Sequence, residues 1–278
     1  LMIAGSGTIP APSATLLASV KRADPSAAYQ PHLFPTLTSP DEAVVSFSYD
    51  PSISYGTGSP PYDPADNPAY DFVWNTVAKL YLGSASNPLD ALINNGDTVF
   101  IKPNWLNYNE AVYTRPEVVR PLIDMAIAAG AATIYIGDGG EGVSITNTVM
   151  NSTGYTDMVS ALQDSNPGIV IQTVNLNVRD DGWRWINLGE NSSFAGSGIA
   201  QSELGTGGSP THTLYGTRYY TESDNQSVNP GGDCLGWYAV NDKLLDTDVI
   251  INVPKMKTHS EMMATLAIKA WVGGTLCS

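Results

Sequence analysis

Hydrophobic positions along this chain follow two repeating patterns, which predict strands connected by helices. Short runs rich in β-branched and aromatic residues predict strands at 43–49, 98–101, 133–136, 169–174 and 248–253. Apolar residues three and four positions apart predict helices at 70–82, 115–129 and 155–163. The order strand, helix, strand between residues 98 and 136 is that of a βαβ unit, whose two strands run parallel. The pattern therefore predicts an α/β fold, with a mostly parallel sheet and flanking helices.

The helix predicted at 115–129 carries residues typical of helix ends. Thr114 stands where an N-cap is expected, and Gly130 follows the last apolar position, where glycine often ends a helix. Pro121 lies inside the pattern, so we expect it to kink the first turns or to move the start of the helix later.

Two segments break these patterns. Residues 1–42 contain six prolines and are predicted to form an extended arm, because dense proline prevents regular helix or sheet. Residues 43–278 are predicted to form the α/β domain, and within it residues 175–246 break into short aromatic runs separated by Gly, Ser and Asn. We interpret residues 175–246 as a loop-rich, partly antiparallel insertion that covers the site.

The apolar run 248–253 is nearly continuous, as is typical of a strand inside a parallel sheet, and it ends at Pro254. Thr258 and Glu261 then have the spacing of a capping box, so we expect a helix to open at this point.

Polar residues follow three of the predicted parallel strands. They are Lys102 and Asn104 after the first, Asp138 and Glu141 after the second, and Lys255, Lys257 and His259 after the third. The carboxyl ends of parallel strands share one edge of a sheet, where ligands of open α/β sheets bind. Clustered cations repel one another unless an anion balances them, and a helix N-terminus would add N–H donors. We therefore expect a site for a small anionic ligand; a buried ion network of the lysines with Asp138 and Glu141 is the alternative.

Each candidate residue has an expected role if the domain is an enzyme. Lys257, His259 and Asp138 are the candidate catalytic residues: His259 would move a proton, and Asp138 would orient a lysine or hold a cation. Four residues would contact the substrate, with Asn104 orienting it: Lys102, Asn104, Lys255 and Lys269. Whether the domain is an enzyme stays open at this point.

The turn Gly137–Gly142 matches the spacing G-x-G-x-x-G of a nucleotide-binding loop. Two features argue against that function: Asp138 and Glu141 would place negative charge against a pyrophosphate, and no helix is predicted directly after Gly142. We interpret the turn as presenting two carboxylates to a divalent metal shared with the substrate, or simply to solvent.

Composition narrows the possible partners. The formal net charge is −14, from 27 acidic and 13 basic residues, which argues against nucleic acid and against an anionic membrane surface. No apolar run is long enough to span a bilayer, and no CxxC pair or CxxCH motif for an iron–sulfur cluster or a c-type haem is present.

The same composition favours an extracellular location. Only 14% of residues are charged, and three glycosylation sequons begin at Asn151, Asn191 and Asn225. Cys234 and Cys277 are expected either to form one disulfide or to remain two buried thiols. The chain begins at Leu1, so we expect a processed or incomplete product. A non-catalytic alternative follows: a structural or adhesive subunit of an extracellular assembly or homo-oligomer, with arm 1–42 crossing onto a neighbour.

At the candidate site the sequence resembles the family named domain of unknown function 362. The resemblance rests on T-V-F-I-K-P-N-W from Thr98, T-R-P-E-V-V from Thr114, I-G-D-G-G from Ile136, D-V-I-I-N-V-P-K-M-K-T-H from Asp248 and A-I-K-A-W-V-G-G from Ala267. It covers about residues 43–278, and Lys257-Thr258-His259 belongs to its most specific part. Ala270 stands where the family usually has Asn. Members commonly continue into more α/β structure and a ferredoxin-like cluster domain, so the resemblance implies the first part of a larger protein. The family's chemistry is generally unassigned, and the resemblance implies a fold and site residues rather than a reaction.

Overall fold

The structure is a computed structural model that describes residues 2–5, 48–53, 55–56, 58–80, 82–140, 142–177, 182–187, 237–255, 257–259 and 263–265. Its main sheet has the strand order β1-β7-β2-β3-β4. The strands are β1 (Met2–Gly5), β7 (Val249–Val253), β2 (Thr98–Pro103), β3 (Thr133–Asp138) and β4 (Val170–Asn175). Strands β7, β2, β3 and β4 are parallel, and β1 pairs with β7 antiparallel. The predicted α/β fold with a mostly parallel sheet is confirmed.

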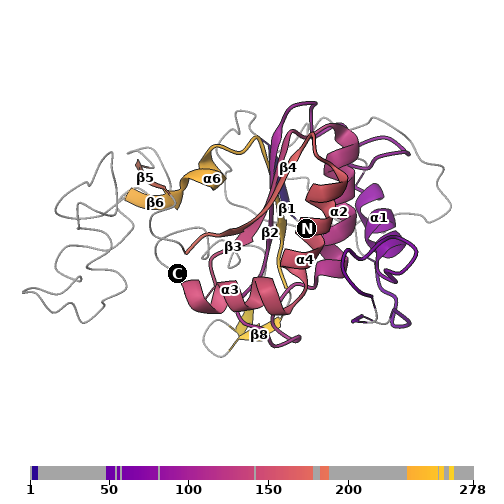
Figure 1. The fold of residues 1–278 in the computed structure, drawn as a ribbon, viewed down its shortest axis with the longest axis horizontal. Helices are drawn as coiled ribbons and strands as arrows, with labels where there is room; N and C mark the ends of the chain where they lie inside the picture. Colours follow the sequence, from indigo (N-terminus) through magenta and orange to yellow (C-terminus); the bar gives the residue numbers. More distant parts are fainter. Residues whose placement is uncertain are drawn as a thin grey trace, which may run out of the picture.

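Three helices lie on one side of the sheet, which Figure 1 shows nearly edge-on. They are α1 (Tyr70–Ala78), α2 (Pro116–Ala129) and α4 (Tyr155–Ser165), close to their predicted ranges. A fourth helix, α3 (Val143–Ser152), lies at the end of the sheet where the parallel strands finish. The sequence pattern did not predict α3.

Both faces of the sheet bury apolar side chains, which explains why its strands are almost continuously apolar. The face toward the helices packs alternate residues of three strands into the main core: Val99, Ile101, Ile134, Ile136, Val249 and Ile251. The opposite face carries a smaller cluster, formed by Phe100, Val174, Leu176 and Leu244.

The start of α2 differs from the prediction. Arg115, not Thr114, occupies the N-cap position, and no side chain caps the helix there. The Thr114 hydroxyl instead donates to the Val253 carbonyl at 2.7 Å and accepts from the Asn104 N–H at 3.1 Å. These long-range bonds are favoured because they satisfy one buried backbone group just after β2 and one at the end of β7. Gly130 ends the helix at φ 92°, as predicted.

Pro121 lies inside α2, which nevertheless begins at Pro116, so the expected later start is wrong. Proline has no N–H to offer the carbonyl four residues earlier, which is that of Glu117. The Asn67 side-chain amide donates to the Glu117 carbonyl at 2.8 Å. A residue from outside the helix therefore supplies the hydrogen bond that Pro121 cannot make.

The chain after β7 also differs from the prediction. β8 (Lys257–His259) pairs antiparallel with β9 (Met263–Thr265), so the helix expected to open at Thr258 is wrong for these residues. A short apolar run fits the helix period and the strand period equally well. Here the backbone N–H and C=O groups are paired across a hairpin instead.

Two further predictions fall mainly outside the described residues. In the predicted insertion, β5 (Trp183–Asn187) and β6 (Trp237–Asn241) pair antiparallel, and the short helix α6 (Asp242–Leu245) follows. Residues 178–181 and 188–236 are not described. Of arm 1–42 only β1 is described, a strand the sequence analysis did not predict. In the predicted strand 43–49, Ser48 and Tyr49 are not in a strand and the other residues lie outside the described part.

Candidate functional site

The candidate site lies where the carboxyl ends of β2 and β7 meet. β3, the next strand in the chain after β2, pairs with β2 on one side. β7, which comes much later in the chain, pairs with β2 on the other side. Such a reversal of strand order opens a crevice beyond the strand ends in open α/β sheets. We call the residues that meet here the β2/β7 rim: Lys102, Asn104, Thr114, Lys255 and Lys257.

Lys257 connects two segments that are far apart in the chain. Its Nζ donates to Asn104 Oδ1 at 2.8 Å and to the Val112 carbonyl at 2.7 Å. The loop between β2 and α2 begins at Asn104 and contains Val112, so one ammonium group binds the start of this loop and a carbonyl in its second half. The structure therefore brings Lys257 and Asn104 together at one edge of the sheet.

Lys102 and Asp138 form an ion pair inside the protein. The Lys102 side chain is 0% exposed and that of Asp138 3%. Asp138 Oδ1 pairs with Lys102 Nζ, and its Oδ2 accepts the Trp105 N–H at 2.6 Å. Both carboxylate oxygens are therefore engaged by groups of the chain itself, and Lys102 points into the protein rather than toward solvent. The predicted contact of Lys102 with a ligand stays a prediction.

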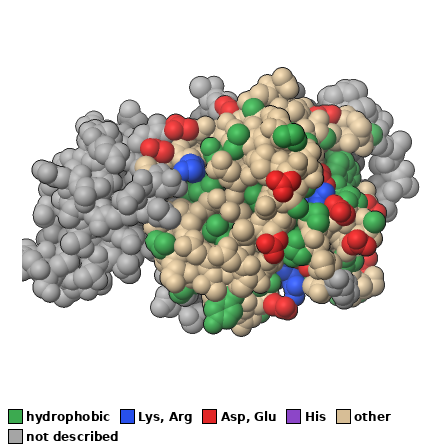
Figure 2. Space-filling view, in the orientation of Figure 1, with side chains coloured by type: hydrophobic (Ala, Val, Ile, Leu, Met, Phe, Trp, Pro, Cys, Tyr) green, Lys and Arg blue, Asp and Glu red, His purple; other side chains and the backbone are tan. Residues whose placement is uncertain are grey.

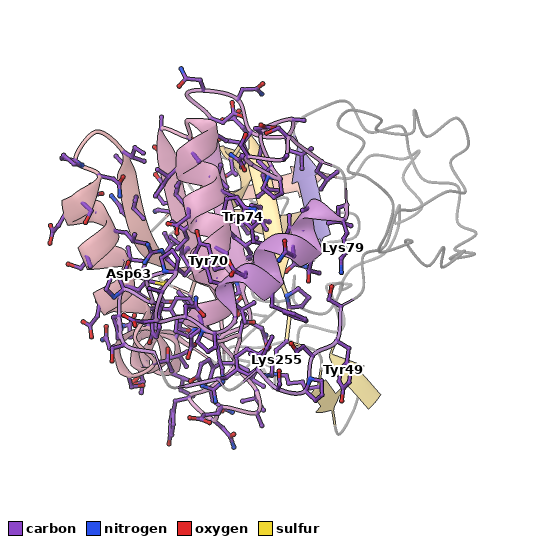
Figure 3. The ribbon with its side chains drawn as sticks, turned by 90° about the vertical axis from the view of Figure 1, so that its right-hand side faces the viewer. Tyr49, Asp63, Tyr70, Trp74, Lys79 and Lys255 are labelled. Atoms are coloured by element: carbon purple, nitrogen blue, oxygen red, sulfur yellow. The ribbon has the colours of Figure 1, made fainter. Side chains whose placement is uncertain are left out.

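Lys255 is half-buried just beyond the end of β7. Burial lowers the pKa of its amine, the positive charge of Arg115 lowers it further, and Glu110 opposes the shift. Figure 3 shows Lys255 near the lower end of the sheet, with Lys79 higher in the view, where α1 ends. Lys255 is therefore partly exposed, in surroundings that disfavour its positive charge.

Arg115 is a functional candidate that the sequence analysis did not single out. Its Nη2 lies 2.6 Å from Glu110 Oε2, and its Nη1 lies 3.9 Å from Glu117 Oε1. Its guanidinium carbon lies 5.9 Å from the centre of the Tyr55 ring. In the sequence, Arg115 was only the first residue of a predicted helix. No local pattern indicates that its charge acts on Lys255.

The turn between β3 and α3 is built on close packing. A Cβ on Gly140 would lie 2.2 Å from the Trp105 carbonyl oxygen, so only glycine fits there. The Gly140 N–H donates to Thr146 Oγ1 at 3.0 Å. Helix α3 begins directly after Gly142, so the statement that no helix follows the turn is wrong. The Asp138 carboxylate faces Lys102 and Trp105, and the Gly140 N–H is already bonded within the chain.

The predicted metal site is only partly described. Among the described residues, no group of three or more His, Cys, Asp or Glu side chains could hold a metal ion. Glu141 lies outside the described part, so the metal prediction for Asp138 and Glu141 remains a prediction.

Several other predicted residues lie outside the described side chains. His259 is described only as backbone of β8. The remaining ones are Lys269, Cys234, Cys277, Asn191 and Asn225. Asn151 is exposed on α3, where its side-chain oxygen accepts from Thr156 Oγ1 at 2.8 Å. The disulfide and the glycosylation sites stay predictions.

The surface agrees with the acidic composition. Figure 2 shows acidic side chains spread over the visible face, with few Lys or Arg among them. In the part of the chain that the structure describes, no helix is both long and apolar enough to cross a membrane.

A mostly parallel sheet, with polar residues gathered beyond the ends of β2 and β7, places the protein among open α/β proteins. The chain belongs to the family Domain of unknown function (DUF362), whose model matches residues 99–180 and 186–277. No curated protein and no solved structure matches the chain.

Proposed function

We propose that this domain binds a small anionic molecule at the β2/β7 rim. Lys255 and Lys257 provide the positive charge, and Asn104 orients the ligand. The observation that carries the proposal is the meeting of Lys257 and Asn104, which are 153 residues apart, in a hydrogen bond of 2.8 Å at this edge. Ligands of open α/β sheets bind at such an edge.

Lys255 is the residue most suited to direct contact with the ligand. It is half-buried, and burial and Arg115 together lower its pKa. A lowered lysine pKa means that the surroundings disfavour the positive charge, so a bound anion next to Lys255 would be stabilised. Lys257 contributes in a second way, because it also holds the β2–α2 loop.

The buried pair of Lys102 and Asp138 holds the backbone next to the proposed site in place. Asp138 binds the Trp105 N–H at 2.6 Å, directly after Asn104. Lys102 in turn fixes Asp138. The pair therefore holds the backbone from which Asn104 reaches Lys257.

An enzymatic activity would require a group that moves a proton at this rim. His259 is proposed for that role because it follows Lys257 by two residues in β8, and alternate residues of a strand share one face. Lys269, with Asp138 and Glu141 around a divalent cation, would complete such a site. An extracellular location is proposed as well, and it is supported by the low charge density and the three sequons.

The test compares Lys255→Ala with Lys79→Ala; Lys79 is exposed, and its side chain donates to Ser48 at 3.1 Å. Inorganic phosphate, sulfate, acetate and malonate serve as probes in titration calorimetry. We expect wild type and Lys79→Ala to bind at least one probe equally well. Lys255→Ala should weaken that binding about ten- to a hundred-fold, the range for a lost charge-assisted hydrogen bond.

Two results would sink the proposal: wild type binds none of the probes, or Lys255→Ala binds as tightly as wild type. Lys257→Ala is a weaker test, because losing its two bonds also loosens the β2–α2 loop. Thermal unfolding of each variant shows whether the fold is intact.

A further inference from the structure

The cluster around Arg115 gives the rim a more specific chemistry than positive charge alone. Arg115 pairs with two carboxylates of unequal burial. The Glu110 side chain is 71% exposed, whereas that of Glu117 is 3% exposed. The Arg115 side chain between them is 16% exposed.

Glu117 is a fixed part of this cluster. Its Oε1 accepts the Gly56 N–H at 2.9 Å, and its backbone carbonyl accepts from Asn67. Burial and these bonds hold the carboxylate behind Arg115. Glu117 therefore cancels part of the guanidinium charge whether or not a ligand is present.

Glu110 is placed very differently. It lies on the β2–α2 loop, and its described side-chain contact is the pair with Arg115 Nη2 at 2.6 Å. Exposed ion pairs contribute little free energy, so this contact is easily exchanged. Glu110 also acts on Lys255, whose pKa its charge raises. Arg115 directly follows Thr114, whose hydroxyl donates to the Val253 carbonyl at 2.7 Å, two residues before Lys255. The segments that carry Arg115 and Lys255 therefore meet at the β2/β7 rim, where one exposed carboxylate acts on both cations.

We propose that Arg115 and Lys255 form a subsite for the carboxylate group of the ligand, and that Glu110 occupies this subsite until the ligand displaces it. The inference rests on the proposed function and names its ligand class. The geometry supports a carboxylate. The Glu110 carboxylate already lies 2.6 Å from Arg115 Nη2, so a group of this shape and charge fits the subsite.

Glu110→Gln tests the inference, with Asp66→Asn as the control. Asp66 is an exposed acid, so its variant loses the same charge elsewhere on the surface. Acetate is titrated into each protein and followed by NMR. Removing the competing carboxylate should raise the affinity for acetate about two- to five-fold, the range for an exposed ion pair, and Asp66→Asn should stay near wild type.

A second measurement needs no ligand. NMR titration of the Lys255 side chain should give a lower pKa in Glu110→Gln than in wild type, because Glu110 raises that pKa. An unchanged Lys255 pKa, an unchanged acetate affinity, or tighter binding of inorganic phosphate than of acetate in Glu110→Gln would overturn the inference. If wild type binds anions through Lys255 but Glu110→Gln changes nothing, only this inference fails. If no protein binds any anion, the proposed function fails with it.

Discussion

At the scale of single residues, the same residue type has opposite environments at one edge of the sheet. Lys102 is fully buried against Asp138, whereas Lys255 is half-buried and the charge of Arg115 helps to lower its pKa. Burying an ion is costly unless its partner is present, so the first lysine depends on Asp138. Burial and the charge of Arg115 disfavour the positive charge of the second lysine, which is why it is proposed to contact an anion. The two lysines therefore differ in role although both follow a parallel strand.

Lys102→Met should be strongly destabilising, because it leaves the Asp138 carboxylate buried without its cation. We expect a loss of about 3–5 kcal/mol in the free energy of unfolding, measured with urea. The double variant Lys102→Met/Asp138→Asn removes the charge and keeps an acceptor for the Trp105 N–H, so it should recover much of this loss. A single variant within about 1 kcal/mol of wild type would show that the pair does not support the fold.

Tyr62 makes the free energy of unfolding depend on pH in the alkaline range. Burial, with a smaller contribution from the charge of Glu117, raises its pKa from the ordinary value of 10.0 to about 12. Between these two values the unfolded chain loses the proton while the folded protein keeps it. Stability should therefore fall as pH rises through this range, and Tyr62→Phe should fall less steeply. Urea unfolding across that range measures the slopes, with exposed Tyr49→Phe as control; equal slopes for all three proteins would contradict the assignment.

At the scale of elements, the loops after β2 and β3 depend on each other. Trp105 follows β2, and its N–H binds Asp138 at the end of β3. Its carbonyl oxygen lies so near Gly140 that no side chain fits at that position. The two loops thus fix each other's backbone at the site, and Gly140 permits their close packing.

Gly140→Ala should destabilise the protein, because its Cβ would meet the Trp105 carbonyl oxygen at 2.2 Å. We expect a cost of about 1–3 kcal/mol or more, as for other overpacked sites. Gly168→Ala is the matched control, since a Cβ there meets nothing within 4 Å. Thermal and urea unfolding of both variants should separate them clearly; equal stabilities would mean that the β3–α3 turn has room to shift.

At the scale of the whole molecule, a strongly acidic protein is proposed to bind an anion. The net charge of −14 repels anions at long range, whereas the proposed site would attract them at short range. Recognition must therefore rest on contacts at the rim.

An assembly role remains a proposal for arm 1–42 and is tested by mass. If the arm beyond β1 crosses onto a neighbouring copy, light scattering should give an oligomer for the whole chain. A monomer would exclude self-assembly through the arm under those conditions.

The sequence by itself determined the parallel sheet, because its apolar runs and turn residues are local signals. The segments around Lys102, Asp138 and Lys257 were recognisable for the same reason. Local signals failed at 257–265, where hairpin pairing replaced a helix, and at α3, whose residues have weak helical spacing.

Only the tertiary structure decided which cation points inward. Lys102 lies near the end of one apolar strand and Lys255 just after another. No residue near them in the chain indicates that Lys102 pairs with buried Asp138, or that the charge of Arg115 acts on Lys255. Burial and charge depend on neighbours more than thirty residues away in sequence, such as Asp138 beside Lys102, 36 residues apart. Those neighbours are set by the strand order β7-β2-β3, which the pattern of single segments does not contain.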